Sequence, residues 1–202
     1  MGYFTHLMGR AKRSALLPVL RSEALARVLA AVLLTDEPRH VRRLAEQTSL
    51  PYSTVQREVD RLERAGVVRT TRLGGTRVVH TDERYPFVSQ LRALLLPAYG
   101  PTEVLADLFR ESDGVEEVFV HGSWARRYEG DWGAPPRDID LLVVGPVSID
   151  YVDEIAADAE DRLGQHVQPT VVSSAEWREP TSGLIRTIKA GHLVRVDLGP
   201  DG

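Results

Sequence analysis

Apolar residues at helical spacing mark three stretches in the first third of the chain. The first apolar face falls between positions 25 and 33, on Leu25, Val28, Leu29, Val32 and Leu33. A short charged stretch over 40–47 follows, and the third stretch repeats Val55, Val59 and Leu62. Because spacings of three and four residues put side chains on one side of a helix, the pattern predicts three helices. The first is expected to end at Asp36-Glu37-Pro38 and the third at Ala65-Gly66, and a tight turn over 48–51 joins the second to the third.

Two strand-like runs, 67–73 and 76–81, come next and are separated by Gly74-Gly75. A Gly-Gly link between such runs predicts a β-hairpin. Three helices followed by a hairpin form the pattern of a winged helix-turn-helix domain, which we assign to residues 1–82. Residues 21–81 resemble the winged helix of arsenic-repressor-type bacterial regulators, on the phrases Leu44-Ala45-Glu46-Gln47-Thr48, Ser53-Thr54-Val55 and Leu62-Glu63-Arg64-Ala65-Gly66-Val67-Val68. The expectation is a DNA-binding transcriptional regulator that acts as a homodimer.

The third helix is the predicted reader of double-stranded DNA. With its apolar side buried, it presents donors and acceptors suited to base edges and phosphates in a major groove, on Tyr52, Ser53, Thr54, Gln56, Arg57 and Arg61. The hairpin adds Arg69, Arg72 and Arg77 on a wing that can reach the DNA backbone or the adjacent minor groove. A winged helix that serves only protein–protein contact is the alternative.

Charge divides the chain in a way that favours DNA as the partner of its first part. Residues 1–80 carry 14 Lys and Arg against 7 Asp and Glu, a net charge of +7. Residues 81–202 carry 11 against 22, a net charge of −11, which brings the whole chain to −4. The basic part is the better candidate for contact with a phosphate backbone. Opposite charges also favour two domains with different partners.

Several classes of protein are excluded by what the sequence lacks. Without Cys there is no disulfide scaffold, thiolate zinc site or cysteine nucleophile. No apolar run approaches the roughly 18–20 residues that span a bilayer. The short apolar run over 15–20, which follows Lys12-Arg13, is broken by Pro18 and has no small-residue cleavage site. We therefore expect a cytoplasmic protein with no membrane partner.

The remainder of the chain alternates between helical and strand-like patterns. A helix over 87–96, bracketed by Pro86 and Pro97, predicts a connector assigned to 83–101, with Leu91, Leu94 and Leu95 available for packing against a second copy or the next domain. Beyond it we predict a helix over 102–111, strands over 115–121, 139–144, 167–172 and 192–198, a helix over 150–163, and a short helix that begins in a capping box, Ser173 with Glu176. This predicts a mixed-sheet α/β domain over 102–202, and an α+β fold class for the chain.

The candidate chemistry lies where two predicted strands meet their loops. Asp138 and Asp140 open one strand, and because residues i and i+2 share a face, their carboxylates are expected side by side. Two adjacent carboxylates repel unless a cation lies between them, and oxygen ligands of this kind suit Mg²⁺. Gly122-Ser123 follows the preceding strand, at a turn whose free N–H groups favour anions. Arg126 and Arg127, one turn on, are expected to hold a triphosphate.

These residues resemble the nucleotidyltransferase superfamily, in particular the minimal nucleotidyltransferases. The resemblance rests on Phe119-Val120-His121-Gly122-Ser123-Trp124-Ala125-Arg126 and Arg137-Asp138-Ile139-Asp140-Leu141-Leu142-Val143. It implies that Asp138 and Asp140 are catalytic metal ligands, that Gly122, Ser123, Arg126 and Arg127 bind the nucleotide, and that Mg²⁺ is the cofactor. In active members, metal ions orient a hydroxyl toward the α-phosphate of a nucleoside triphosphate, and pyrophosphate leaves.

Two departures from the family's pattern argue against nucleotidyl transfer. The spacer between Ser123 and Asp138 is 14 residues, long for the family. A third carboxylate, expected on a following antiparallel strand over 166–172, is replaced by Gln168, and an amide is a weaker metal ligand that cannot act as a base. Glu176 and Asp197 are the nearest substitutes, although a helix cap and a surface residue are the better interpretations. We expect His121 to be structural and Trp124, Trp132 and Trp177 to pack in the core or at interfaces.

Three hypotheses follow. The leading one is a DNA-binding transcriptional regulator whose nucleotidyltransferase-like domain binds nucleotide and Mg²⁺ or a protein partner, with weak or no activity. The alternative is an active adenylyltransferase of the antitoxin type, which transfers AMP from ATP to a partner toxin and autoregulates its operon. In the third, both domains are interaction modules without catalysis.

Overall fold

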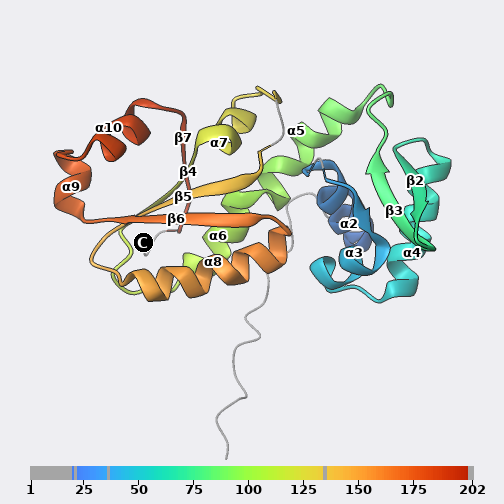
Figure 1. Cartoon of the computed structure of the whole chain (residues 1–202), viewed down its shortest axis with the longest axis horizontal. Helices are drawn as coiled ribbons and strands as arrows, with labels where there is room; N and C mark the ends of the chain where they lie inside the picture. Colours follow the sequence, from blue (N-terminus) through green and yellow to red (C-terminus); the bar gives the residue numbers. More distant parts are fainter. Residues whose placement is uncertain (1–19, 21, 36, 134–135, 200–202) are drawn as a thin grey trace, which may run out of the picture.

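The computed structural model describes residues 20, 22–35, 37–133 and 136–199. It is an α+β structure with an N-terminal group of helices and a three-stranded antiparallel sheet, followed by a domain built on a four-stranded mixed sheet. Figure 1 shows these two parts side by side, joined by a pair of helices. The basic and apolar stretch over 12–19 and the predicted helix-ending residue Asp36 lie outside the described residues. No helix in the described ranges is long and apolar enough to cross a membrane.

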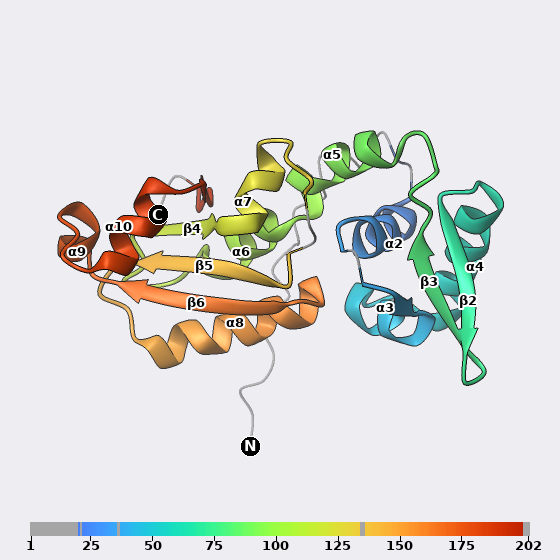
Figure 2. The same ribbon diagram turned by 45° about the horizontal axis from the view of Figure 1, so that its top comes forward.

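The first part has the winged helix-turn-helix arrangement that the hydrophobic pattern predicts. Its helices are α2 (Glu23–Leu33), α3 (Val41–Thr48) and α4 (Tyr52–Arg64), and its strands are β1 (Arg39–His40), β2 (Val68–Leu73) and β3 (Thr76–Thr81). The strand order is β1-β3-β2, and all pairs are antiparallel. Val55, Val59 and Leu62 of α4 are buried in the core as expected. Figure 2 shows α4 at the end of the molecule farthest from the second sheet.

Two turns fix the orientation of α4 and the wing. The α3–α4 turn contains Ser49 at φ 54°, a left-handed conformation that ends α3, and Pro51 immediately precedes α4. In the hairpin, Gly74 and Gly75 have φ of 54° and 81°, and Leu73 pairs with Thr76 across the loop. Because a two-residue hairpin loop of this type needs positive φ at both positions, the Gly-Gly sequence allows the strands to turn without strain.

The connector departs from the prediction at one proline. Helix α5 (Val88–Tyr99) continues through Pro97, where the sequence predicts an end. Proline removes the bond to the carbonyl four residues earlier, here that of Ala93, and both Pro97 and Ala93 are exposed, so water can satisfy that carbonyl. The backbone N–H of Gly100 then donates to the Leu96 carbonyl at 2.9 Å and closes the last turn. Helix α6 (Pro101–Phe109) follows directly.

The second part contains the predicted elements with small shifts at their ends. In chain order they are β4 (Glu117–His121), α7 (Gly122–Tyr128), β5 (Asp138–Val144), α8 (Ile149–Leu163), β6 (His166–Val172), α9 (Ser174–Arg178), α10 (Gly183–Ala190) and β7 (Leu193–Arg195). The strand order is β6-β5-β4-β7. The sequence-based expectation that the strand over 166–172 is antiparallel is wrong, since β6 is parallel to β5. The reason is that α8 carries the chain back to the starting end of the sheet before β6 begins.

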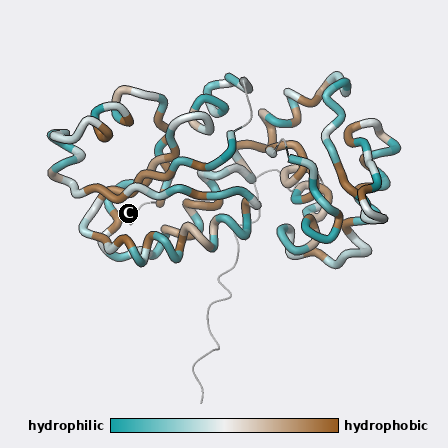
Figure 3. The backbone as a smooth tube through the Cα atoms, in the orientation of Figure 1, coloured by the Kyte–Doolittle hydropathy of each residue, from teal (hydrophilic) through white to brown (hydrophobic). Residues whose placement is uncertain are grey.

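The two faces of this sheet pack against different elements. One face, with Val118, Ile139 and Leu141, joins the main core that includes residues of α6 and α8. The other face, with Phe119, Leu142 and Val144, packs against Trp177 of α9 and Ile185 of α10. Figure 3 shows that β5 and β6 begin with hydrophilic residues and become hydrophobic farther along. The second face therefore has a covered apolar end and a polar end at the start of β5.

Candidate nucleic-acid interface and aspartate site

The outward side of α4 is polar along its whole length. Of the six helix residues predicted to contact DNA, Thr54 is half-buried and the others, Tyr52, Ser53, Gln56, Arg57 and Arg61, are exposed. The Gln56 amide donates to the Tyr52 hydroxyl at 3.4 Å, so these two side chains lie together at the start of the helix. Recognition helices contact base edges mainly through their N-terminal residues. The geometry brings the predicted helix residues onto one surface.

The wing arginines are not equivalent. Arg69 and Arg72 are exposed on β2, and neither has a carboxylate within ion-pair distance among the described residues. Arg77 instead is part of the structural contact between the wing and α4. Its guanidinium pairs with the carboxylate of Asp60 and, at 2.7 Å, with that of Glu63. The Glu63 carboxylate also accepts hydrogen bonds from the Thr70 backbone and hydroxyl.

This network assigns Arg77 a contact that the sequence pattern does not indicate. Asp60 and Glu63 lie three residues apart on α4, and both carboxylates reach Arg77 on β3 of the hairpin. The Thr70 hydroxyl, the strongest influence, and Arg77 hold the pKa of Glu63 below its ordinary value, so this carboxylate is ionised at neutral pH. Arg77 therefore pairs with two acids on α4 and offsets one of their two negative charges, whereas Arg57, Arg69 and Arg72 are exposed and form no ion pair among the described residues.

Asp138 and Asp140 lie on the polar end of the second sheet face. Their shared face follows from strand alternation in β5, and Leu142 and Val144 continue the same face under α9 and α10. Across the sheet, Asp140 is directly opposite His121 on β4 and Gln168 on β6. The predicted pair of carboxylates is thus brought together, with a histidine on one side and an amide on the other.

Gly122 is required by the position of Asp140. It has φ of 66°, and a Cβ placed on it would lie 2.5 Å from Oδ2 of Asp140. Real Cβ atoms do not approach an oxygen so closely, so any other residue here would displace the carboxylate. Gly122 also begins α7, whose N-cap residue makes no side-chain cap hydrogen bond. The Gly-Ser turn and the aspartate pair therefore form one local structure.

Burial makes the aspartate pair electrostatically unfavourable. It raises the pKa of Asp140 above its ordinary value, an effect that His121 opposes and the Asp138 carboxylate reinforces. Burial lowers the pKa of His121, whose Nε2 atom is buried and has no hydrogen-bond partner. A neutral His121 compensates Asp140 weakly, so a cation between the two carboxylates would lower the energy of the site.

The two arginines of α7 have different environments. Arg126 is exposed, as a phosphate-binding residue requires. Arg127 is 3% exposed, and its guanidinium donates to the Leu34 carbonyl at 3.2 Å, at the C-terminal end of α2. It also lies over the rings of Trp124 and Trp132, at 5.2 and 5.0 Å. Arg127 thus links α7 to the winged helix and is not placed to hold a triphosphate.

Like Arg127, Arg92 of the connector donates to a backbone carbonyl at the end of α2. Its Nε donates to the Leu33 carbonyl at 2.8 Å, and its guanidinium pairs with Glu83 and lies 5.6 Å from the Trp132 ring. Two cations therefore meet the carbonyl end of α2, where the helix dipole favours positive charge. Sequence reasoning missed both contacts, because the acceptors are backbone carbonyls about 60 to 90 positions away in the chain. The expectation that the tryptophans serve packing is confirmed by the buried Trp124 and by Trp177, which packs on Phe119.

At the position beside Asp140, β6 carries an amide, Gln168, where a third acid was expected. In the described part of the chain, no group of three or more His, Asp or Glu side chains could hold a metal ion. Glu176 follows the far end of β6, where its carboxylate accepts from the backbone N–H groups of Thr181 and Ser182. The Ser173 hydroxyl caps α9 by accepting from the Glu176 N–H, at 3.2 Å, so half of the predicted capping box is present. Glu176 is a structural residue remote from Asp138.

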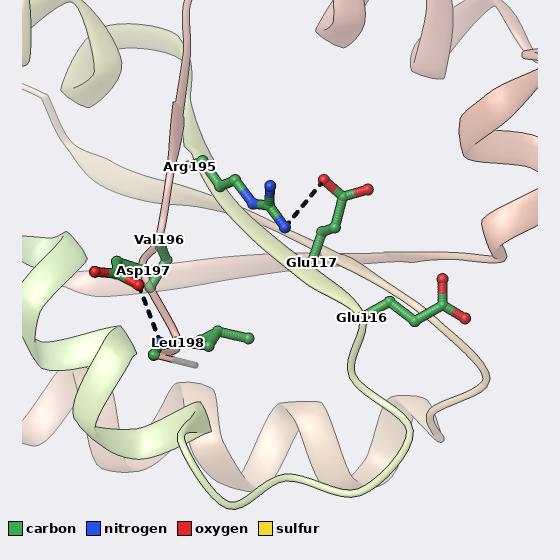
Figure 4. Close-up of a pocket in the computed structure, with 7 residues that line it drawn as sticks. Glu116, Glu117, Arg195, Val196, Asp197 and Leu198 are labelled. Carbon is green, nitrogen blue, oxygen red and sulfur yellow. Dashed lines mark hydrogen bonds and ion pairs between the residues drawn. The ribbon is translucent and has the colours of Figure 1, made fainter. Parts of the chain in front are cut away.

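Asp197 also lies away from the end of the sheet that carries Asp138 and Asp140. It follows β7, which pairs with β4 so that Arg195 is opposite Phe119 and Leu193 is opposite His121. Asp197 lines a cavity of about 380 Å³ together with Glu116, Glu117 and Arg195. Figure 4 shows these four side chains. Its carboxylate accepts from the Gly199 N–H at 3.0 Å, while Arg195 pairs with Glu117 at 3.7 Å. Neither substitute can complete a carboxylate triad with Asp138 and Asp140.

Comparisons with known proteins add little to this geometry. No family model matches the chain, and no curated protein matches it. Among solved structures, the chain is similar to TrmBL2, an archaeal chromatin protein whose structure is described as showing a novel mode of DNA binding. The two are 18% identical with a TM-score of 0.30, and the match covers 88% of this chain and 78% of that chain.

Proposed function

We propose that this protein is a DNA-binding regulator that contacts double-stranded DNA through α4 and the wing. The observation that carries the proposal is the exposed, cationic surface formed by α4 and β2. On it, Arg57, Arg69 and Arg72 have no carboxylate within ion-pair distance among the described residues, while Arg77 pairs with the nearby Asp60 and Glu63. Exposed cations on the outward side of a helix are suited to a phosphate backbone.

The shape of this surface fits a duplex. Helix α4 has 13 residues, which corresponds to a length of roughly 20 Å, and a major groove about 12 Å wide admits a helix. Gln56 and Arg57 carry the side chains best suited to adenine and guanine edges, and we expect Arg61 and Arg72 to contact phosphates. Homodimerisation would join two half-sites, and the exposed Leu94 of α5, at 42% exposure, is available for that contact.

The direct test is selection of duplexes from a random-sequence library, followed by fluorescence anisotropy with the enriched sequence. Arg57→Ala is expected to weaken binding by roughly 5- to 150-fold, the loss of one bidentate base contact. Arg186→Ala is the matched control, because Arg186 is exposed on α10 in the second domain and should leave affinity unchanged. Failure to enrich any sequence, or equal effects of the two variants, would contradict the proposal.

For the second domain we propose binding of Mg²⁺ and a nucleoside triphosphate with little or no nucleotidyl transfer. Asp138 and Asp140 supply two carboxylate oxygen donors to the cation, and the close approach of Gly122 to Asp140 supports a built site. When bound, Mg²⁺ would polarise the triphosphate toward attack. Gln168 occupies the register position beside Asp140, and an amide there can donate or accept a hydrogen bond but cannot take a proton from an attacking hydroxyl.

Binding and turnover are separated by two measurements. MgCl₂ with ATP should raise the melting temperature of the wild-type protein, because a ligand of the native state stabilises it by about 2.7 kcal/mol at 100 times its Kd. Asp138→Asn with Asp140→Asn should abolish that increase. Labelled ATP should give no label transfer to the protein encoded by a neighbouring gene. Transfer that depends on Asp138 and Asp140 would instead establish the alternative, an adenylyltransferase of the antitoxin type.

A further inference from the structure

Helix α7 extends from the aspartate pair to the connector between the two domains. It begins at Gly122, where a Cβ would lie 2.5 Å from Oδ2 of Asp140, and it ends at Tyr128. Its seven residues correspond to a length of roughly 10 Å. The helix packs against β4, β5 and β7 of the second sheet and against α5 of the connector. One short helix therefore touches both the aspartate pair and the element that leads to the winged helix.

The last residue of α7 lies at the joint between α5 and α6. Helix α5 ends and α6 begins at Gly100, with no loop between them. The Tyr128 hydroxyl accepts hydrogen bonds from the backbone N–H and the hydroxyl of Thr102, at 3.0 and 2.9 Å, in the first turn of α6. A Cβ on Gly100 would lie 2.6 Å from the same hydroxyl. Burial raises the pKa of Tyr128 to about 12, so the hydroxyl keeps its proton at neutral pH.

Arg127 links the same turn of α7 to the winged helix itself. Its guanidinium donates to the carbonyl of Leu34, the residue that ends α2. It also lies over the rings of Trp124 and Trp132, and Trp124 is a residue of α7 that is 2% exposed. Side chains in such a close-packed interior have no free volume in which to absorb a movement. A shift of α7 would therefore move its contacts with both α2 and the joint.

The aspartate pair lies against the opposite end of α7. Because Gly122 has no side chain, the carboxylate of Asp140 directly faces the first turn of the helix. The Asp138 and Asp140 carboxylates repel each other, and a cation held between them would draw them together. The position of Asp140 against Gly122 would then change. Cation binding at one end of α7 would in this way act on the contacts at its other end.

We propose that α7 couples the aspartate site to the winged helix, so that binding of Mg²⁺ and a nucleoside triphosphate changes the affinity of the protein for DNA. The coupling rests on the proposed function of both domains and adds the regulation of one by the other. Tyr128 and Arg127 are positioning residues, since both act through α2 and the joint and neither contacts the aspartate pair. Their loss should remove the coupling and leave each ligand able to bind.

The test measures the Kd of the full-length protein for the selected duplex in MgCl₂, with and without saturating ATP. ATP should change the wild-type Kd by about 5-fold or more. In Tyr128→Phe, which removes only the acceptor of the Thr102 hydrogen bonds, the change should fall below about 2-fold, with the Kd of each ligand alone unaltered. Arg127→Leu should behave in the same way. Tyr151→Phe is the matched control, because the Tyr151 hydroxyl pairs with Ser112 at 2.8 Å, beyond the other end of α6, and it should retain the wild-type change.

A further variant separates coupling from competition. As a polyanion, ATP also competes for the basic surface of α4 and the wing. Asp138→Asn with Asp140→Asn should lose the effect of ATP on DNA binding, and an effect that persists in this variant would overturn the coupling. It is equally overturned if both ligands bind the wild type without affecting each other, or if Tyr128→Phe and Arg127→Leu retain the full effect. Failure of either ligand to bind by itself would overturn the proposed function, and the coupling with it.

Discussion

Replacing Gly122 by alanine should damage the aspartate site far more than the fold. Gly122 has φ of 66°, a conformation that costs an L-residue about 1–2 kcal/mol. In addition, the new Cβ would lie 2.5 Å from Oδ2 of Asp140, so the carboxylate must rotate away. The oxygen is the far end of a short side chain, and an off-rotamer position costs about 0.5–1.5 kcal/mol. The expected total destabilisation is therefore about 1.5–3.5 kcal/mol.

Gly130→Ala separates the two contributions. Gly130 lies just beyond the other end of α7, with φ of 90°, and a Cβ there meets nothing within 4 Å. It should show only the backbone cost of about 1–2 kcal/mol. The assay is urea unfolding followed by circular dichroism, with the slope of the transition compared among variants. A second readout is the increase in melting temperature with MgCl₂ and ATP, which Gly122→Ala should lose and Gly130→Ala should keep.

A double-mutant cycle identifies the partner of the new methyl group. Asp140→Ala removes the oxygen that this methyl group would displace, so the excess cost of Gly122→Ala should disappear in that background. The coupling free energy should equal about 0.5–1.5 kcal/mol, the off-rotamer cost. Additive effects of the two substitutions, or an unchanged response of Gly122→Ala to MgCl₂ and ATP, would refute the assigned contact between Gly122 and Asp140.

Other contacts give further predictions. Arg77→Ala should lower the free energy of unfolding by about 0.5–2 kcal/mol, because two partly exposed ion pairs to Asp60 and Glu63 are lost, and urea unfolding measures it. Arg127→Leu should cost about 1–3 kcal/mol, since the Leu34 carbonyl loses a buried donor, and the same assay applies. Asp140→Asn should stabilise the fold at neutral pH. Because burial raises the pKa of Asp140 in the folded protein, ionisation costs stability as the pH rises from the ordinary value of 3.8 through the folded value. The advantage of Asp140→Asn over the wild type should therefore disappear below about pH 3.8, and thermal melts across pH would reveal it. An equal advantage at low and neutral pH would contradict the raised pKa.

Local signals in the sequence predict most of the fold. Gly74-Gly75 predicts the hairpin, because its two positive φ angles are a local requirement. The helical spacing of Val55, Val59 and Leu62 identifies the buried side of α4, and with it the exposed side. The aspartate pair is predictable for the same reason, since strand alternation alone puts Asp138 and Asp140 on one face.

What the sequence does not predict depends on long-range packing. Pro97 is a local signal for a helix end, yet its place on the exposed side of α5 lets the helix continue. The pairing direction of β6 follows from where α8 returns the chain, which no pattern within β6 records. Arg127 matches a phosphate-binding pattern, but the folded chain buries it against the end of α2. Arg77 similarly pairs with Asp60 and Glu63, which come close to it only because the hairpin folds back against α4.

The salt dependence of DNA binding tests the central claim most directly. The affinity of the full-length protein for the selected duplex is measured over a range of NaCl concentrations, for the wild type and for Arg69→Ala, Arg72→Ala and Arg186→Ala. Each phosphate contact contributes roughly 0.9 to the slope of log affinity against log salt. The account predicts a steep slope in the wild type, a decrease of about 1 for each wing variant, and no change for Arg186→Ala. A wild-type affinity that is independent of salt, or identical slopes in all four proteins, would contradict it.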